Sequence, residues 1–318
     1  MEKTKRSPAL LNGCKSLKRR IVKNRMNIAL YVMILPTAAY ILIFHYLPMF
    51  GLLLSFKDYN SFLGVWDSPW AAMGGFEHFV TFVTLPNFWR IIGNTLELSV
   101  YSIAVNTLLP IILALFMNEI RIKWFKKTVQ TISYAPYFVS TVVVVGMLFA
   151  FFNTESGVLA NLFGMSSSIM ESETWFSTVY VVSGLWQGLG WWAIIYIGTL
   201  ANVDQNLHEA AVLDGAGRLK RIWYINVPEI LPMAIIMFIL SIGNVLTVGY
   251  EKVYLMQTAG NLQASEVIST YIYRVSLGAR VPQYSYATAI GLFNSVINVI
   301  LLCIANFISG KVSETSLW

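Results

Sequence analysis

The sequence predicts an all-α membrane protein with six transmembrane helices. The chain has 318 residues, of which 56% are hydrophobic and only 12% are charged, and its mean hydropathy is +0.62. A soluble chain of this length needs more charged residues to cover its surface, so lipid is the expected solvent. Six stretches lack Asp, Glu, Lys and Arg and reach the roughly 20 residues with which an α-helix crosses a bilayer. They are residues 26–56, 98–118, 128–154, 174–203, 230–250 and 281–310.

The distribution of basic residues predicts the orientation of these segments. Nine Lys and Arg residues precede the first segment, four follow the second, three follow the fourth, and Lys311 follows the sixth. These residues, most of the 22 in the chain, fall on one side of the membrane, and an excess of Lys and Arg marks the cytoplasmic side. The remaining Lys and Arg residues lie in the connections on the other side of the membrane. They are Lys57, Arg90, Lys252, Arg274 and Arg280. Both termini are therefore expected in the cytoplasm.

The chain divides into a basic cytoplasmic tail, residues 1–25, and one six-helix membrane domain, residues 26–318. The tail has no interleaved aromatic residues and adjoins a membrane segment, so we expect it to contact anionic lipid and not nucleic acid. The outer connection at 57–92 is rich in aromatic residues, which suit the layer of lipid headgroups. A second outer connection spans 251–280.

No pattern in this chain predicts an enzyme or a metal site. Cys14 and Cys303 lie in regions too far apart to pair, and the three histidines lack metal-ligand spacing. The phosphate-binding loop G-x-x-x-x-G-K-[ST] is missing, so the chain is not expected to hydrolyse ATP. Glu97, at the predicted outer end of the second segment, is interpreted as structural and not as part of a proton relay.

The inner connection at 204–228 predicts a compact helical projection. Asn206 and Glu209 have the spacing of a capping box, so a short helix is expected to begin there. Gly215 and Gly217 then favour a left-handed stop or kink.

The stretch RLKRIWYI, which follows, has one apolar and one basic face and is expected to lie along the inner membrane surface. Pro228 and Pro232 are tolerated at the start of the next span because a missing N–H matters least there. The apolar face of the projection is too small to bury itself, which favours docking into a groove on another protein. An ordinary inner loop, capped by Glu209 and turned by glycines, fits the composition equally well.

This segment resembles a signature of the membrane subunits of binding-protein-dependent ABC importers. That signature reads E-A-A, three residues, G, nine residues, I, one residue, L-P. Its positions are occupied here by Glu209, Ala210, Ala211, Gly215, Ile225 and Pro228, with Val227 in place of leucine. The extended form EAAVLDGAG, with Asp214 and Gly217, is similar to the sugar-importer branch. The fragments GFEHF, YIYR and YSYATAIGLF are also similar to this branch, and the last two most resemble oligosaccharide and polysaccharide permeases of the LplB-like group.

The resemblance implies a type I ABC importer permease fold, in the cytoplasmic (inner) membrane of a bacterium. Residues 206–217 would form a coupling helix that docks in a cleft of a cytoplasmic ATPase. There Glu209 would meet a basic residue and Gly215 would permit the bend. Two copies of the ATPase would bind ATP and magnesium, and this chain would hold no cofactor. The other implied partners are a second homologous permease subunit and an outer binding protein that delivers a carbohydrate.

Candidate substrate contacts lie midway along the fourth and fifth segments. The stretches LWQGLGWW and LSIGN combine flat aromatic faces, glycines and a few hydrogen-bonding groups, which together suit a sugar ring. The resemblance matches passage-lining positions to Gln187, Gly188, Trp191 and Ser241, and Asn244 belongs to the same stretch. Many relatives carry proline where this chain has Gly190. Ordinary helix packing is the competing interpretation for each of these residues.

Three other functions share some of these features. A permease of the same superfamily for peptides, amino acids or ions would keep the coupling segment. An ion-driven secondary transporter would need ionisable groups inside the membrane, and the six segments contain only His45. A membrane-embedded enzyme would need a catalytic constellation, and the sequence offers none. The sequence therefore favours the membrane subunit of a sugar importer.

Overall fold

The structure, a computed structural model, describes residues 28, 30–162, 164 and 167–312. Over these residues the chain is helical, and the one extended pairing is an isolated bridge between Lys57 and Trp70. The predicted all-α class is therefore confirmed for the described part. The tail at 1–25, with Cys14, lies outside the described residues, so the expectations for it stay predictions.

The long helices are α5 (Phe88–Glu119), α9 (Glu173–Ala201), α12 (Val227–Ile242) and α16 (Tyr284–Val312). An earlier helical stretch, Leu30–Phe56, includes η1 (Leu42–Tyr46), α2 (Leu47–Met49) and η2 (Phe50–Phe56). Between α5 and α9 lie α6 (Lys123–Tyr134), η4 (Ala135–Phe138), α7 (Thr141–Phe151), α8 (Val158–Leu162) and η5 (Ile169–Glu171). The other short helices are α3 (Gly64–Asp67), η3 (Met73–Gly75), α4 (Glu77–Val83), α10 (Gln205–Leu213), α11 (Arg218–Arg221), η6 (Ile222–Asn226), α13 (Tyr250–Met256), α14 (Leu262–Ser265) and α15 (Ile268–Ser276).

Four helices of the described part are long and apolar enough to cross a membrane. They are Leu30–Phe56, Phe88–Glu119, Arg218–Ile242 and Tyr284–Lys311. A fifth crossing is possible if the bent pair formed by Lys123–Phe138 and Thr141–Phe151 counts as one span. The structure thus supports four or five of the six predicted crossings by length and composition.

The third predicted segment, residues 128–154, is not one continuous helix. Its two parts meet at an angle of 97°. Pro136 lies just before the bend, where it has no N–H to donate and restricts the preceding residue. Ser140 then caps α7, because its Oγ accepts a hydrogen bond from the backbone N–H of Val143 at 3.4 Å. The expectation of an unbroken helix was wrong because it counted uncharged residues and ignored these two local signals.

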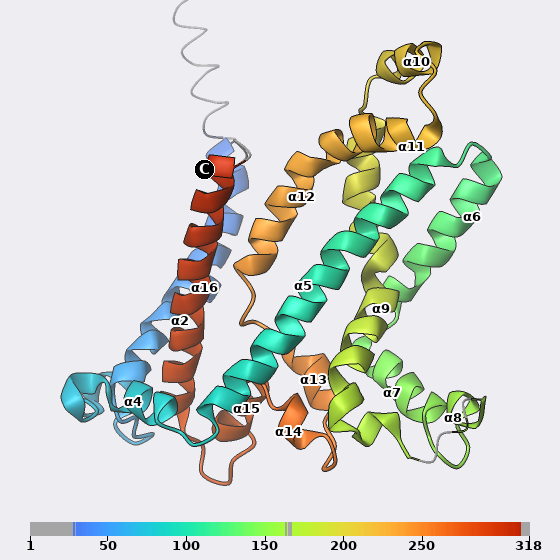
Figure 1. The fold of residues 1–318 in the computed structure, drawn as a ribbon. Coiled ribbons are helices and arrows are strands. Elements are labelled where there is room, and N and C mark those ends of the chain that lie inside the picture. The colour runs from blue at the N-terminus through green and yellow to red at the C-terminus, as the bar shows by residue number, and fades with distance from the viewer. Residues whose placement is uncertain (1–27, 29, 163, 165–166, 313–318) are drawn as a thin grey trace, which may run out of the picture.

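The fourth predicted segment corresponds to α9, which packs along α5 (Figure 1). Its 29 residues are long enough to cross a bilayer at about 1.5 Å per residue. It is absent from the group of sufficiently apolar helices, since glycine, serine, threonine and glutamine dilute its hydrophobic residues. Gly190 lies where α9 meets α6: a Cβ there would stand 2.3 Å from the backbone oxygen of Ser133. Glycine therefore permits direct contact between the two helix backbones.

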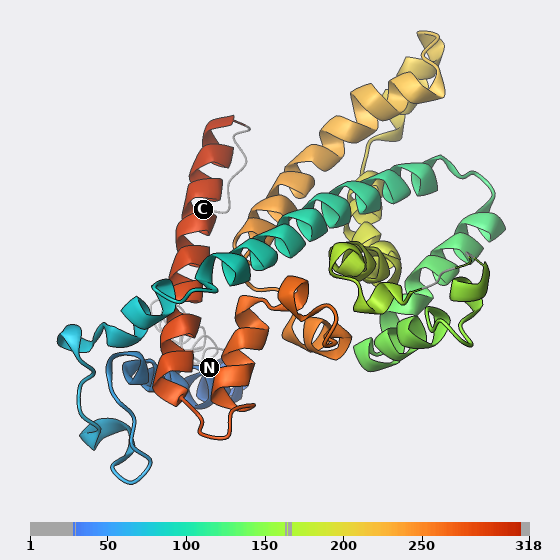
Figure 2. The same ribbon diagram turned by 60° about the horizontal axis from the view of Figure 1, so that its bottom comes forward.

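The molecule has two distinct ends. α10 projects at one end, and the described C-terminal end of α16 lies at that same end (Figure 1). The helices α4, α8, α13, α14 and α15 gather at the opposite end (Figure 1). Viewed from there, α13 to α15 lie between α16 and the segment of α7 to α9 (Figure 2). Each end thus has its own set of short helices, joined by the long ones.

A buried carboxylate holds the end opposite α10 together. Glu266, which is 3% exposed, accepts a hydrogen bond from Arg90 at 2.9 Å and also forms an ion pair with Arg274. The Asn94 side-chain amide donates to the backbone oxygen of Glu266 at 3.0 Å. These contacts join the first turns of α5 to the segment between α14 and α15. They give the start of α5 a fixed position against the last third of the chain.

Glu97 lies further along α5 and contacts α9. Its carboxylate accepts a hydrogen bond from the hydroxyl of Ser177 at 2.6 Å. The sequence interpretation of Glu97 as structural named no partner on another helix. The partner is instead a serine on the neighbouring long helix, so this bond supports the α5–α9 packing.

Candidate functional site

The projection begins at an aspartate cap. The Oδ1 atom of Asp204 accepts a hydrogen bond from the backbone N–H of Asn206 at 2.9 Å, and α10 begins at Gln205. The predicted capping box of Asn206 and Glu209 was therefore wrong, since Asn206 is already inside the helix. A carboxylate at Asp204 is the better cap because it combines a hydrogen-bond acceptor with a charge that favours the helix N-terminus.

The projection ends in a Schellman motif at Gly215. The backbone N–H of Ala216 donates to the oxygen of Ala211 at 2.8 Å, and the N–H of Gly215 donates to the oxygen of Val212 at 3.0 Å. Gly215 has φ +76°, a left-handed conformation that glycine adopts without a steric penalty. The predicted left-handed stop at Gly215 is confirmed. Gly217 has φ −68° and precedes α11, so it ends no helix in this way.

The outer surface of α10 has no partner within the described part of the chain. None of its residues is buried, and Leu207, Val212 and Leu213 are all exposed, the last by 88%. Glu209 and Ala210 are exposed as well, and the Glu209 carboxylate makes no hydrogen bond or ion pair with any described residue. Apolar side chains beside a free carboxylate suit docking onto another protein.

The stretch RLKRIWYI is the first part of one helix that runs from Arg218 to Ile242. A π-helical turn, η6 (Ile222–Asn226), joins α11 to α12 without a break. It includes Ile225 and ends two residues before Pro228, which cannot donate the usual hydrogen bond and whose ring crowds the preceding turn. The wider turn accommodates the proline, so the helix continues from α11 into α12. The expectation that RLKRIWYI lies along the inner membrane surface stays a prediction.

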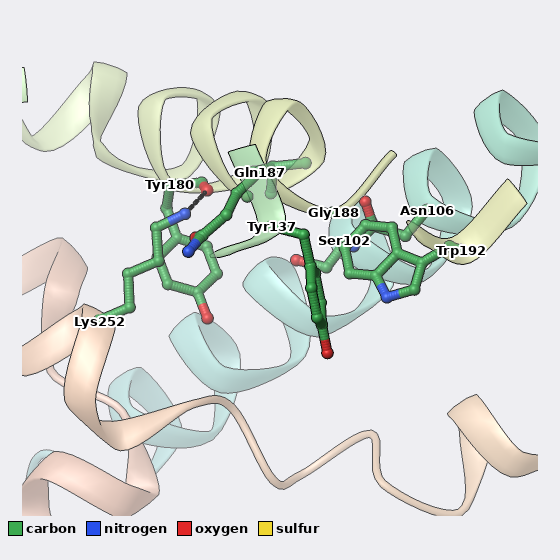
Figure 3. Close-up of a pocket in the computed structure, with 10 residues that line it drawn as sticks. Ser102, Asn106, Tyr137, Tyr180, Gln187, Gly188, Trp192 and Lys252 are labelled. Atoms are coloured by element: carbon green, nitrogen blue, oxygen red, sulfur yellow. Dashed lines mark hydrogen bonds between the residues drawn. The ribbon is translucent and has the colours of Figure 1, made fainter. Parts of the chain in front are cut away.

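A cavity of about 350 Å³ lies between α5, η4, α9 and α13 (Figure 3). Its lining combines aromatic rings, hydroxyls, amides and one ammonium group. The lining residues are Ser102, Asn106, Tyr137, Tyr180, Val181, Gly184, Gln187, Gly188, Trp192 and Lys252. A second cavity of about 250 Å³ shares Ser102, Asn106 and Trp192 with the first and continues to Met237 and Ser241 on α12. The two cavities share this part of their walls and lie in succession between α13 and the last turns of α12, and together they are called the path.

The structure brings three of the five predicted passage residues to this path. Gln187 and Gly188 line the first cavity, and Ser241 lines the second. Trp191 and Asn244 line neither cavity. Trp191 stacks on Tyr137 from outside, with ring centroids 4.4 Å apart and planes 7° from parallel. The Asn244 amide is exposed and donates to the backbone oxygen of Leu240 at 3.0 Å.

A hydrogen bond of Gln187 and the missing side chain of Gly188 explain how the first cavity keeps its shape. The Gln187 amide nitrogen donates to the backbone oxygen of Val139 at 2.7 Å, which ties α9 to the bend before α7. A Cβ at Gly188 would lie 2.5 Å from the indole ring of Trp192, so glycine makes room for that ring beside the cavity. Asn106 presents a buried side-chain oxygen with no hydrogen-bond partner among the described residues. The wall therefore contains a free acceptor beside a flat aromatic face.

Lys252 is the lining residue that sequence analysis assigned only to an outer connection. It lies on α13, outside the candidate membrane-spanning helices, and its side chain reaches back to α9. Burial lowers the pKa of its ammonium group from 10.5 to about 8, because desolvation disfavours the charge. At neutral pH the group stays mostly protonated. A sequence signal existed, since Lys252 is the one lysine in residues 251–280 and follows an apolar run.

We expect Trp191→Ala to lower transport by about two- to tenfold, the range that corresponds to loss of one aromatic stacking pair. The reason is indirect: Trp191 fixes the orientation of the Tyr137 ring, which forms one wall of the cavity. Uptake kinetics of the purified, reconstituted complex would measure this. Trp186→Ala is the matched control, because Trp186 lies on the same helix but faces a separate apolar cavity. Equal uptake by both variants would contradict a role for the Trp191–Tyr137 stack.

The described residues contain no group of three or more His, Cys, Asp or Glu side chains that could hold a metal ion. Cys303 is exposed on α16. The chemistry of the two cavities is therefore that of hydrogen bonding, aromatic contact and one positive charge. Such a lining suits a polar ligand.

Comparison with known proteins covers most of the chain. Residues 107–314 match a family described as the binding-protein-dependent transport system inner membrane component. Protein LplB of Bacillus subtilis (strain 168) is 40% identical over 293 residues, which are 91% of each chain. The polygalacturonan/rhamnogalacturonan transport system permease protein YteP of the same organism is 38% identical over 305 residues, 95% of this chain and 94% of that protein.

Solved structures give the same result for the fold. A chain in the crystal structure of a bacterial alginate ABC transporter, in complex with an alginate pentasaccharide-bound periplasmic protein, has a TM-score of 0.83 and 35% identity. The match covers 92% of this chain and 98% of that one. A second structure, of a bacterial ABC transporter involved in import of the acidic polysaccharide alginate, is similar at a TM-score of 0.83 and 36% identity.

Proposed function

Because this chain belongs to the family of binding-protein-dependent transport system inner membrane components, we propose that it is the permease subunit of an ATP-driven importer of a sugar. The sugar is an oligosaccharide or a polysaccharide fragment, delivered by a binding protein outside the membrane. The observation that carries this proposal is that a projecting α10, none of whose residues is buried, occurs in the same subunit as a polar and aromatic path.

The lining of the path supports a carbohydrate. Sugar rings present apolar faces to aromatic side chains and hydroxyls to hydrogen-bonding groups. Tyr137 and Trp192 supply flat faces, and Ser102, Asn106 and Gln187 supply hydroxyl and amide groups. The names of the relatives support this choice, since a permease for polygalacturonan and rhamnogalacturonan and a transporter for alginate are among them. A permease of the same superfamily for peptides or amino acids is the alternative that uptake competition would reveal.

The proposed arrangement in the membrane has six crossings. Four are the long apolar helices, the bent pair of α6 and α7 supplies a fifth, and α9 supplies the sixth because neighbouring helices cover its polar residues. The shared position of α10 and the C-terminal end of α16 supports a cytoplasmic location for both (Figure 1). The N-terminal tail would lie on that side as well. The domain limits of 1–25 and 26–318, with the coupling loop at 204–228, form part of this proposal.

The coupling segment would transmit the ATPase movement to this subunit. Glu209, Ala210, Ala211, Asp214 and Gly215 would present the contact surface, while Gly217, Ile225 and Pro228 would join it to α12. Two copies of the ATPase, with ATP and magnesium, and a second homologous permease would complete the complex. This chain would hold no cofactor itself, and closure of the ATPase pair would move α10 as a rigid body.

Reconstitution tests the proposed function directly. The chain would be purified with its second permease and ATPase, placed in proteoliposomes and supplied with its binding protein. We expect uptake of a labelled oligosaccharide that needs ATP inside the vesicle and is competed by other oligosaccharides. Competition by peptides or amino acids with no effect of sugars would overturn the carbohydrate assignment. Uptake that persists without ATP under an ion gradient would overturn the ATP-driven mechanism.

A further inference from the structure

The Lys252 ammonium group is a positive charge with no negative partner among the residues that the structure describes. Its Nζ donates to the backbone oxygen of Tyr180 at 2.9 Å and lies 4.9 Å from the centroid of the Tyr180 ring. No carboxylate of the described residues lies within ion-pair distance of it. An ammonium group has three donors, and one protein hydrogen bond is found for it. Two N–H groups are therefore available to a ligand.

The surrounding chain makes space for this group. A Cβ at Gly184 on α9 would stand 3.1 Å from Lys252 Nζ, closer than nearly all ordinary Cβ contacts. Glycine at this position lets the ammonium group approach α9 and reach the cavity wall. Lys252 comes from α13 and Gly184 from α9, so the arrangement exists only in the folded molecule.

The charge lies beside groups that suit a sugar. Lys252, Tyr180 and Gln187 lie together at one end of the cavity, and Trp192 with Asn106 lies at the other, with the Tyr137 ring between them (Figure 3). The second cavity continues from Trp192 and Asn106 toward Ser241. A ligand entering from the α13 end would therefore meet the charge first and the shared aromatic and amide wall afterwards.

We propose that Lys252 recognises the carboxylate of an acidic sugar residue, a uronic acid, as the oligosaccharide enters the path. This inference rests on the proposed function and makes it more specific, because it assigns the substrate to the anionic carbohydrates. A carboxylate would accept charge-assisted hydrogen bonds from the free N–H groups of Lys252, which are stronger than bonds between neutral groups. The Tyr137 ring, next along the cavity, would contact a sugar face. A neutral sugar would leave the charge of Lys252 without a counter-ion.

Lys252 also has a contact that is purely structural, and the test separates the two roles. Its hydrogen bond to Tyr180 joins α13 to α9, so any substitution that removes the ammonium group also removes that bond. A structural role alone would change the affinity for acidic and neutral ligands alike. A recognition role would change the affinity for the acidic ligand selectively.

The test measures ligand binding to the complete complex of both permeases and the ATPase, in lipid nanodiscs without the binding protein. The probes are trigalacturonate, its fully methyl-esterified form, and the neutral maltotriose. For Lys252→Met we expect about a tenfold weaker binding of trigalacturonate and unchanged binding of the ester. Lys252→Arg should keep the preference for the acid because it keeps the charge. Arg280→Gln, which removes an exposed cation elsewhere in residues 251–280, should match the wild type.

The outcomes distinguish this inference from the proposed function. Equal affinity of the wild type for trigalacturonate and its ester, or equal losses for both in Lys252→Met, would overturn the acidic-sugar site. Binding of maltotriose alone would overturn it as well and would leave sugar transport standing. Failure of the wild type to bind any of the three carbohydrates, together with no ATP-dependent sugar uptake, would overturn both.

Discussion

Glu209→Lys is expected to abolish ATP-driven uptake while the subunit still inserts and folds. The fold should survive because the Glu209 side chain is exposed and has no partner among the described residues. The coupling should fail because a lysine would face the basic residue that the proposed ATPase contact places opposite it. Loss of a buried charge pair at an interface costs about 2–5 kcal/mol, so affinity for the ATPase should fall by about thirtyfold or more. Co-purification of the ATPase with the permease pair and uptake by proteoliposomes would measure both effects.

Two further variants define the specificity of that result. Glu209→Gln should keep the assembly but weaken the ATPase contact, since it removes the charge and keeps the shape. Glu155→Lys reverses an exposed charge in the connection between α7 and α8, near the end opposite α10, and should leave the ATPase contact unchanged. A Glu209→Lys complex that retains its ATPase as firmly as the wild type would refute the role assigned to Glu209.

Gly190→Ala should strongly destabilise the subunit. The added Cβ would lie 2.3 Å from the backbone oxygen and 2.5 Å from the carbonyl carbon of Ser133. Backbone atoms cannot rotate away as a side chain can, so α9 would have to separate from α6. Overpacking costs about 1–3 kcal/mol and occasionally more, and a backbone clash belongs at the upper end of that range. Thermal unfolding of the purified complex in detergent, with the yield of folded subunit, would show the loss.

Gly198→Ala is the matched control on the same helix. No atom outside its own helix lies within 4 Å of a Cβ at Gly198, and this residue is exposed. Alanine should therefore be neutral or should stabilise α9 by up to about 1 kcal/mol, the difference in helix propensity between the two residues. Similar thermal stability for the Gly190 and Gly198 variants would show that α9 does not depend on close packing against α6.

Local sequence features predicted the elements whose causes are themselves local. Gly215 was predicted to stop its helix in a left-handed conformation, and the Schellman motif confirms this because the cause lies within a few residues. The cap was placed at Asn206 instead of Asp204, an error of two residues between side chains that both accept a backbone hydrogen bond. Helix ends are the part of an element where such competing local choices decide the outcome.

Contacts between distant segments account for what the sequence did not predict. Lys252 meets Tyr180, 72 residues away, and no spacing rule relates two such positions. The Gln187 amide donates to Val139, 48 residues away, at the bend before α7, and the local signals of Pro136 and Ser140 do not reveal this contact. The family resemblance pointed to Gln187, Gly188 and Ser241, which line the two cavities, but the side on which Trp191 stands depends on the rotation of α9 against η4.

The uninterrupted helix from Arg218 to Ile242 has a mechanical consequence. Its 25 residues extend about 37 Å at 1.5 Å each, with the projection attached at one end and Ser241 near the other. Under the proposed coupling, a tilt of about 10° around one end of this helix would move the other end by about 6 Å, comparable to the rise of one helical turn. Movement of α10 by the proposed ATPase would thereby displace the wall of the sugar path near Ser241, because the helix between them is continuous.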